Sequence, residues 1–242
     1  MNIDASVGIF YSGQARTFAN CWPNQWWYVL RHFPHAKVFA SVADDAQAKD
    51  IELLRQHYPK ASIEVVKQPD FPDAEKYETI NTWGGYIRSA KPVNILRAFW
   101  HYEKVWKMAE GQKFDINIRI RPDLWFQEFE LPAHVEKWEC WVPAWGSWGG
   151  INDRFAIMGH AAAERYFNSF NSLEGLLTDG CPFHPETLTR AAVERDGICR
   201  IRQQLAATFK IRRLPDQEHY FKEWLVDEPF LDSELYRAIL HK

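Results

Sequence analysis

The chain has 242 residues, of which 46% are apolar, so it can bury a hydrophobic core without disulfides or a structural metal. Its 29 Lys and Arg residues nearly balance 32 Asp and Glu residues, and the net charge of -3 argues against a binder of duplex DNA or another polyanion. The four cysteines are widely spaced, which argues against a zinc knuckle or a disulfide framework and predicts reduced thiols. We therefore expect a small-molecule ligand and no nucleic acid.

The amino terminus lacks a basic region followed by a long apolar run, and no segment approaches the roughly 18 apolar residues of a membrane helix. The sequence thus predicts a cytoplasmic protein with no integral membrane segment, while association with a membrane surface stays open. Twelve tryptophans are unusual in this length. They are either large core side chains or stacking platforms for sugars or bases.

The first part of the chain alternates between strand and helix patterns. Short β-branched and aromatic runs at residues 7–11 and 38–42 end at turn residues and are typical of buried strands. A helix is expected between them, at residues 24–31. Residues 46–57 have helical spacing, and residues 63–67 return to strand character. This alternation predicts one compact α/β unit with a mixed, mostly parallel sheet flanked by helices.

Residues 69–92 contain three prolines and two adjacent glycines, which predicts an irregular excursion over the carboxyl edge of the sheet. Residues 94–109 form the clearest helix, because apolar side chains recur at spacings of three and four and Gly111 follows as a C-cap. Further expected elements are a strand at 115–121, a helix opening at 184–186, a short strand at 210–214 and a helical tail from 216.

The strand at 115–121 delivers charged side chains to its carboxyl end. Strand alternation places Arg119 and Arg121 on one face, and Asp123 follows directly beyond them. Arginine clamps phosphate with paired hydrogen bonds, and a carboxylate can hold Mg²⁺ or Mn²⁺ that is already bound to diphosphate oxygens. The array suits an anionic ligand, with an exposed ion pair as the alternative.

The end of the first strand is a second candidate region. Small residues, backbone N–H groups and an arginine there suit a nucleotide, although a simple polar turn has the same composition. The residues concerned are Ser12, Gly13, Arg16 and Thr17. Asn94 and Arg97 share one helical face and join the candidate ligand contacts, with solvated surface as the alternative.

The third region follows four tryptophans and the Gly149-Gly150 pair. Glycines allow close approach of a ligand, tryptophan faces can stack on sugars, and Asp153 can accept a hydroxyl proton. The alternative is that Asp153 caps a turn through an Asx hydrogen bond. Glu186 and His184 can supply a further base or metal contact, or else His184 simply caps the helix.

These motifs occur in a fixed order: Ser-Gly-Gln-x-Arg-Thr-Phe, Arg-x-Arg-Pro-Asp-Leu, Gly-Gly-Ile-Asn-Asp-Arg-Phe-Ala-Ile-x-Gly and His-Pro-Glu. The order resembles a group of bacterial and viral glycosyltransferase-like proteins of the GT-A fold, over residues 7 to about 190. The resemblance implies one GT-A, Rossmann-like domain over residues 1–242. Its first half, to about 125, would bind a nucleotide-sugar, often a UDP-sugar, and its second half, from about 126, would bind the acceptor.

In this resemblance, Arg-Pro-Asp stands where GT-A enzymes usually show Asp-x-Asp. Asp123 would then be the carboxylate for the metal and diphosphate, while Arg121 occupies the first acidic position. Either Arg121 partly replaces the cation, or Mn²⁺ or Mg²⁺ binds weakly through Asp123 and the diphosphate. The implied nucleotide contacts are Ser12, Gly13, Arg16, Thr17 and Asp44 or Asp45.

Asp153 matches the Asn-Asp-Arg-Phe motif, which makes it the expected acceptor-binding residue or catalytic base, with Glu186 as the second candidate. The expected activity is transfer of a sugar from a nucleotide-sugar to a glycan or other hydroxyl acceptor, and the stereochemistry stays open. The alternatives are a sugar-phosphate nucleotidyltransferase and a catalytically silent carbohydrate- or nucleotide-binding protein.

Overall fold

The computed structural model describes residues 5–15, 17–44, 48–77 and 91–211. In these residues the main sheet has seven strands in the order β3-β2-β1-β4-β7-β6-β8. They are β1 Val7–Gly13, β2 Lys37–Ala43, β3 Ser62–Val66, β4 Ile116–Ile120, β6 Glu139–Pro143, β7 Phe155–Gly159 and β8 Arg200–Leu205. Four of the six strand pairings are parallel, and β7 runs antiparallel to both neighbours. This confirms the α/β class with a mixed, mostly parallel sheet, an arrangement consistent with a Rossmann-like GT-A fold.

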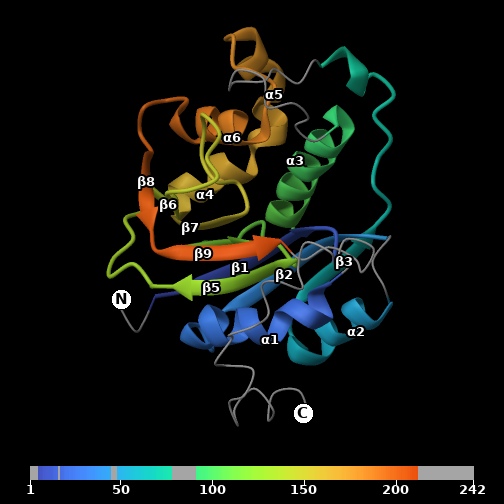
Figure 1. Cartoon of the computed structure of the whole chain (residues 1–242), viewed down its shortest axis with the longest axis vertical. Coiled ribbons are helices and arrows are strands. Elements are labelled where there is room, and N and C mark those ends of the chain that lie inside the picture. The colour runs from blue at the N-terminus through green and yellow to red at the C-terminus, as the bar shows by residue number, and fades with distance from the viewer. Residues whose placement is uncertain (1–4, 16, 45–47, 78–90, 212–242) are drawn as a thin grey trace.

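Helices flank both faces of this sheet (Figure 1). One face carries α1 Phe18–Tyr28, α2 Ala48–His57 and a second sheet of β5 Leu124–Phe129 with β9 Ala207–Ile211. The other carries α3 Pro92–Lys107, α4 His160–Phe167 and α6 Pro185–Glu194, with α5 Ser169–Thr178 packed on α3 and α6. Two short 3₁₀ helices complete the set, Leu30–His32 and Ala74–Lys76.

The main sheet has a hydrophobic core on each face, and alternate side chains of a strand enter opposite cores. Phe10 of β1 packs with α3 and α4, whereas its neighbours Ile9 and Tyr11 pack with α1 and the second sheet. All three side chains are at most 1% exposed. The sheet is therefore buried on both sides, which explains why its central strands read as continuous apolar runs.

Most predicted elements are present, but the first helix was misplaced. It was expected at residues 24–31, whereas α1 begins at Phe18, contains Pro23 and ends at Tyr28. Asn24 and Gln25 interrupt the apolar pattern although both are buried. The Asn24 amide donates to the Phe126 carbonyl at 2.8 Å, and Gln25 donates to backbone carbonyls at the start of β5 and just before it.

The later elements differ from the prediction in smaller ways. Gly111 has a φ of +79°, but α3 already ends at Lys107 with Met108 as its C-cap. The last expected strand, 210–214, is β9 as far as Ile211. Residues 78–90, 212–214 and the tail from 216 lie outside the described part of the chain.

As expected, Cys21, Cys140, Cys181 and Cys199 are reduced thiols. None of the helices described here is both long and apolar enough to cross a bilayer.

The topology brings distant motifs to one edge. The strands β1, β2, β3 and β4 are parallel, so their carboxyl ends lie along the same edge of the sheet. Because β7 is antiparallel to β4, it begins at that edge, with Phe155 opposite Ile120. The segments that contain Asp123, after β4, and Asp153, before β7, are therefore neighbours.

Candidate functional site

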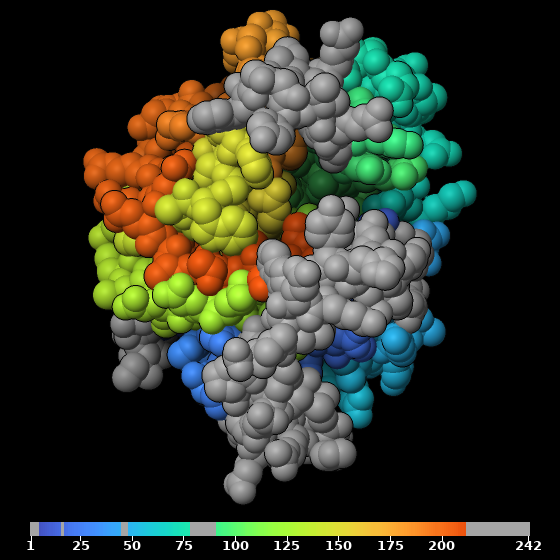
Figure 2. All heavy atoms as spheres, in the orientation of Figure 1, coloured from blue at the N-terminus to red at the C-terminus, as the bar shows by residue number. Residues whose placement is uncertain are grey.

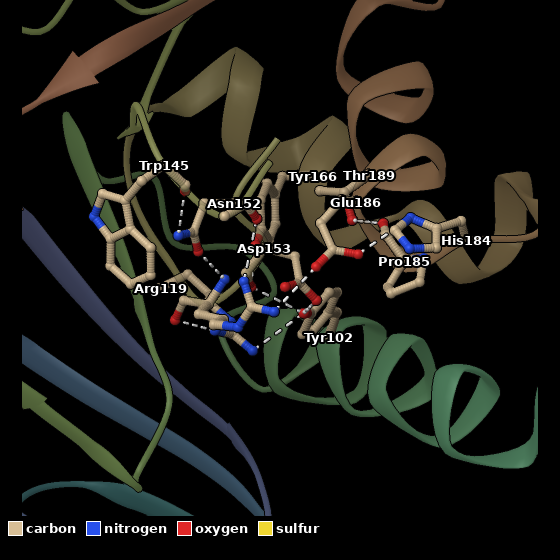
Figure 3. Close-up of polar contacts among 12 residues, drawn as sticks. Tyr102, Arg119, Trp145, Asn152, Asp153, Tyr166, His184, Pro185, Glu186 and Thr189 are labelled. Atoms are coloured by element: carbon tan, nitrogen blue, oxygen red, sulfur yellow. Dashed lines mark hydrogen bonds and ion pairs between the residues drawn. The ribbon is translucent and has the colours of Figure 1, made fainter. Parts of the chain in front are cut away.

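A group of charged side chains, which we call the edge cluster, gathers where β4 ends and β7 begins. Figure 3 shows Tyr102 of α3, Arg119 of β4, Asp153, His184 just before α6 and Glu186 of α6 turned toward a common centre. The complete set is Tyr102, Arg119, Arg121, Asp123, Asp153, Arg154, His184 and Glu186. The cluster thus joins both halves of the chain at the carboxyl edge, where open α/β sheets bind their ligands.

Asp153 is held from two sides by buried tyrosines. The Tyr102 hydroxyl lies 3.2 Å from the Asp153 carbonyl oxygen and 3.3 Å from Oδ2, and the Tyr166 hydroxyl donates to the same carbonyl at 2.9 Å. Burial raises the pKa of both tyrosines, so each keeps the proton that it donates. Within the described residues, Oδ1 of Asp153 accepts no hydrogen bond. One carboxylate oxygen of a fixed side chain is therefore available to a ligand.

Glu186 lies beside Asp153 in the first turn of α6. Its Oε1 accepts from the Arg154 guanidinium at 3.1 Å, and Nδ1 of His184 lies 3.2 Å from Oε2 without hydrogen-bond geometry. Burial and then the negative charge of Asp153 raise the pKa of Glu186 to about 8, although Arg154 opposes the shift. Glu186 is therefore a neutral acid at pH 7. Asp153 and Glu186, the two alternative candidates for the catalytic base, therefore lie close together.

His184 occupies the N-cap position of α6, but its side chain makes no capping hydrogen bond. Burial is the largest effect on this imidazole and lowers its pKa, with Asp153 acting in the opposite direction. The imidazole next to Glu186 is therefore neutral at pH 7. His184 occupies the N-cap position, but its side chain does not cap the helix.

Arg119 is not the ligand contact that strand alternation suggested. Its guanidinium donates to the Tyr102 hydroxyl at 3.1 Å, lies 4.9 Å from the centre of that ring and donates to the Arg154 carbonyl. The residue is only 3% exposed, because α3 covers this face of β4. Its Nε has no partner among the described residues. Arg119 therefore links α3 to the segment before β7 and gives little access to solvent.

Arg121 and Asp123 form a closed pair. Nε and one terminal nitrogen of Arg121 donate to the two carboxylate oxygens of Asp123, at 2.8 and 2.7 Å. Burial is the largest single effect and by itself would lower the pKa of Arg121, but the charge and hydrogen bonds of Asp123, together with the charge of Asp153, raise the pKa above its ordinary value. The proposed metal carboxylate thus has both oxygens engaged. No group of three His, Cys, Asp or Glu side chains suited to a metal occurs in the described residues either, so this arrangement does not fit a resident Mg²⁺ or Mn²⁺ ion.

The end of β1 reaches the same edge. Ser12 is buried and its hydroxyl has no partner within the described ranges, while Gly13 adopts a φ of +108° that favours glycine. Asp44 lies exposed in the turn after β2, where its N–H donates to the Val66 carbonyl at 3.0 Å. These three residues therefore lie at the edge as predicted. Two further candidates, Arg16 and Asp45, fall outside the described residues.

The start of α1 is less open to a phosphate than the sequence suggested. Thr17 is its buried N-cap residue. In the first turn, the Ala19 N–H donates to the carboxylate of Asp50 from α2 at 2.7 Å. A carboxylate at this position satisfies the partial positive charge of the helix end, so the chain supplies its own anion.

Asn94 and Arg97 do not contact the edge cluster. Asn94 is exposed near the start of α3. Arg97 donates to the Pro69 carbonyl at 3.3 Å and to Asp70 at 3.4 Å. Arg97 therefore secures the excursion that follows β3.

The tryptophans occupy both buried and exposed positions. Trp22 and Trp125 are buried, whereas Trp145 and Trp148 are among the exposed large side chains. Trp145 is nevertheless anchored, since its indole N–H donates to the Ala207 carbonyl at 2.8 Å and its ring packs on Phe209. In the space-filling view, the yellow surface around residue 150 lies beside the orange-red strands β8 and β9, and the surface is hollowed between it and green α3 (Figure 2).

Gly150 fixes this loop against α6. A Cβ atom at Gly150 would lie 2.0 Å from the Glu186 carbonyl oxygen, so only glycine permits this approach. The Ile151 N–H donates to the same carbonyl at 3.1 Å. The close contact places Asp153 and Glu186 together.

Sequence reasoning missed Tyr102, Tyr166 and Arg154. The two tyrosines occupy core positions of amphipathic helices, where the available signal was that a buried tyrosine hydroxyl needs a partner. Arg154 belongs to the Asn-Asp-Arg-Phe motif, and it bonds both Glu186 and the Gly146 carbonyl. Tyr102, Tyr166 and Arg154 together hold Asp153 and Glu186 in place.

No protein-family model matches the chain, and a search of curated proteins found no significant match.

Proposed function

We propose that the protein is a cytoplasmic glycosyltransferase that moves a sugar from a nucleotide-sugar, with a UDP-sugar as first choice, to a hydroxyl of a glycan or other acceptor. The observation that carries the proposal is the environment of Asp153. One oxygen of its carboxylate is held by Tyr102 and the other is available, beside a Glu186 that keeps its proton at pH 7. A carboxylate in this state can act as a general base.

The reaction has three needs that the edge cluster can meet. The leaving diphosphate must be stabilised, the oxocarbenium-like transition state must be accommodated, and an inverting route requires a base at the acceptor hydroxyl. Oδ1 of Asp153 would take the hydroxyl proton. Neutral Glu186 leaves Asp153 as the single negative charge of that pair.

The surroundings support a sugar nucleotide as the donor. Ser12, Gly13 and Asp44 lie along the carboxyl edge, and we assign them to the nucleotide. The exposed faces of Trp145 and Trp148 follow β6 at the same edge and suit the apolar face of a sugar ring.

The test is to incubate the protein with UDP-[¹⁴C]glucose and other sugar nucleotides and to follow donor binding and slow donor hydrolysis. Asp153→Asn should reduce turnover by about 10²-fold or more while donor affinity changes little. Asp179→Asn, in an exposed ion pair on the end of α5, is the matched control and should behave as wild type. Failure of every sugar nucleotide to bind would sink the proposal.

A catalytically silent carbohydrate-binding protein is the second candidate. The closed Arg121–Asp123 pair and the exposed Trp145 and Trp148 favour it. In that case Asp123→Ala and Asp153→Ala would leave nucleotide affinity and any donor turnover unchanged. Trp148→Ala would instead weaken retention on immobilised glycans.

A further inference from the structure

We propose that Arg121 binds the diphosphate group directly, without a divalent cation, and that Asp123 is the positioning residue that holds Arg121 in place. The identity of the ligand as a nucleotide-sugar rests on the proposed function. The binding chemistry, a diphosphate on a guanidinium, can be tested without it.

The geometry of the pair leaves part of Arg121 available. A guanidinium has five N–H donors, and two of those of Arg121 bond to Asp123, which leaves three. These three have no hydrogen-bond partner in the part of the chain that the structure describes. The side chain of Arg121 is 31% exposed, against 6% for Asp123. The buried Asp123 carboxylate therefore binds the Nε side of the Arg121 guanidinium, while the remaining N–H groups can bind a ligand.

The other cations of the edge cluster are less suited to this task. Arg119 is 3% exposed and bonds to Tyr102 and to the Arg154 carbonyl. Arg154 has a side chain that is 20% exposed and bonds to Glu186. The N-terminus of α1 already holds the Asp50 carboxylate. Arg121 is thus the most accessible guanidinium of the cluster.

The charge balance of the cluster also favours an anion. Three arginines face three acidic residues there: Arg119, Arg121 and Arg154 against Asp123, Asp153 and Glu186. Because Glu186 is neutral at pH 7, the arginines exceed the charged carboxylates by one. A diphosphate would enter a site with surplus positive charge, whereas a divalent cation would meet Arg121 and find both Asp123 oxygens engaged.

The experiment measures binding of inorganic pyrophosphate and of UDP by calorimetry, in EDTA and in Mn²⁺. Wild type should bind both ligands in EDTA, and Mn²⁺ should change its UDP affinity less than about threefold. Arg121→Gln should weaken pyrophosphate binding in EDTA roughly 10- to 100-fold, the range expected for lost charged hydrogen bonds, and Arg121→Lys should restore part of it. Arg190→Gln, in an exposed pair on α6, is the control and should bind as wild type.

Arg121→Gln leaves Asp123 buried without its partner and can impair folding. The double variant Arg121→Gln/Asp123→Asn removes both charges and keeps the pair neutral, so it should fold and still lose pyrophosphate binding. Asp123→Asn alone should retain binding in EDTA within about tenfold of wild type, since Arg121 keeps its charge.

The outcomes separate this inference from the proposed function. Pyrophosphate affinity that is unchanged in the double variant would overturn the inference. So would UDP binding that requires Mn²⁺ and loses its Mn²⁺ dependence in Asp123→Asn, a result that leaves the glycosyltransferase standing. Arg121-dependent pyrophosphate binding with no binding of any sugar nucleotide would instead support the anion site and refute the glycosyltransferase.

Discussion

Replacement of Glu186 by glutamine should make the protein less sensitive to alkaline pH. Burial and the charge of Asp153 raise the pKa of Glu186 from 4.5 to about 8 in the folded protein, and unfolding returns it to the lower value. Between these values the folded state binds one proton more than the unfolded state, so stability falls as pH rises. The contribution of Glu186 is complete below about pH 4.5 and is lost as pH increases through about 8.

The magnitude follows from the size of the shift. Each pH unit inside the window costs about 1.4 kcal/mol for one proton. Between pH 6 and pH 8, wild type should therefore lose about 2 kcal/mol relative to a variant that cannot ionise at this position. Glu186→Gln removes the titration and keeps an oxygen that accepts from Arg154.

Urea unfolding of both proteins at pH 6, 7 and 8 provides the measurement. Subtracting the unfolding free energy of one protein from that of the other removes the contribution of groups that titrate elsewhere in the chain. Glu194→Gln, which removes one partner of an exposed ion pair at the end of the same helix, is the matched control. A constant difference between wild type and Glu186→Gln across this range would refute the reasoning, because it would mean that Arg154 keeps Glu186 ionised in the folded state.

Two further substitutions test the support of the site. Gly150→Ala should destabilise the protein by about 2 kcal/mol or more, since its Cβ would lie 2.0 Å from the Glu186 carbonyl oxygen; urea unfolding that matches wild type would refute this close contact. Tyr102→Phe removes the hydroxyl that accepts from Arg119 and approaches Asp153, and should cost about 1–3 kcal/mol in the same assay. An unchanged midpoint would show that the hydroxyl is dispensable.

The parallel half of the sheet could be predicted because its strands are short apolar runs followed by turn residues. The run of β1 is buried on both faces, so each side chain carries the same signal. The sequence of β8, Arg-Ile-Arg-Gln-Gln-Leu, lacks that signal because it is an edge strand that is mostly not buried. The start of α1 was missed because Asn24 and Gln25 look like surface residues in the sequence. Both are in fact buried, and their amides bond to the backbone around β5.

The candidate site could likewise be predicted only in part. Its acidic residues could be named from motifs, but their surroundings depend on packing between distant segments. Alternation gave the face on which Arg119 lies, yet it could not reveal that Tyr102 of α3 covers that face. The adjacency of Asp153 and Glu186 depends on the close approach at Gly150, which spacing along the chain does not encode.

The arginine at position 121 and the proton on Glu186 both reduce the negative charge of the edge cluster. With an acidic residue at 121, the carboxylates there would repel one another unless a cation lay between them. Arg121 supplies that positive charge from within the chain and fixes Asp123 through two hydrogen bonds. The buried Glu186 removes a further negative charge by retaining its proton. Both effects make the edge less dependent on a bound cation and more favourable to an anion, so the Arg121-Pro122-Asp123 sequence is compatible with the proposed diphosphate ligand.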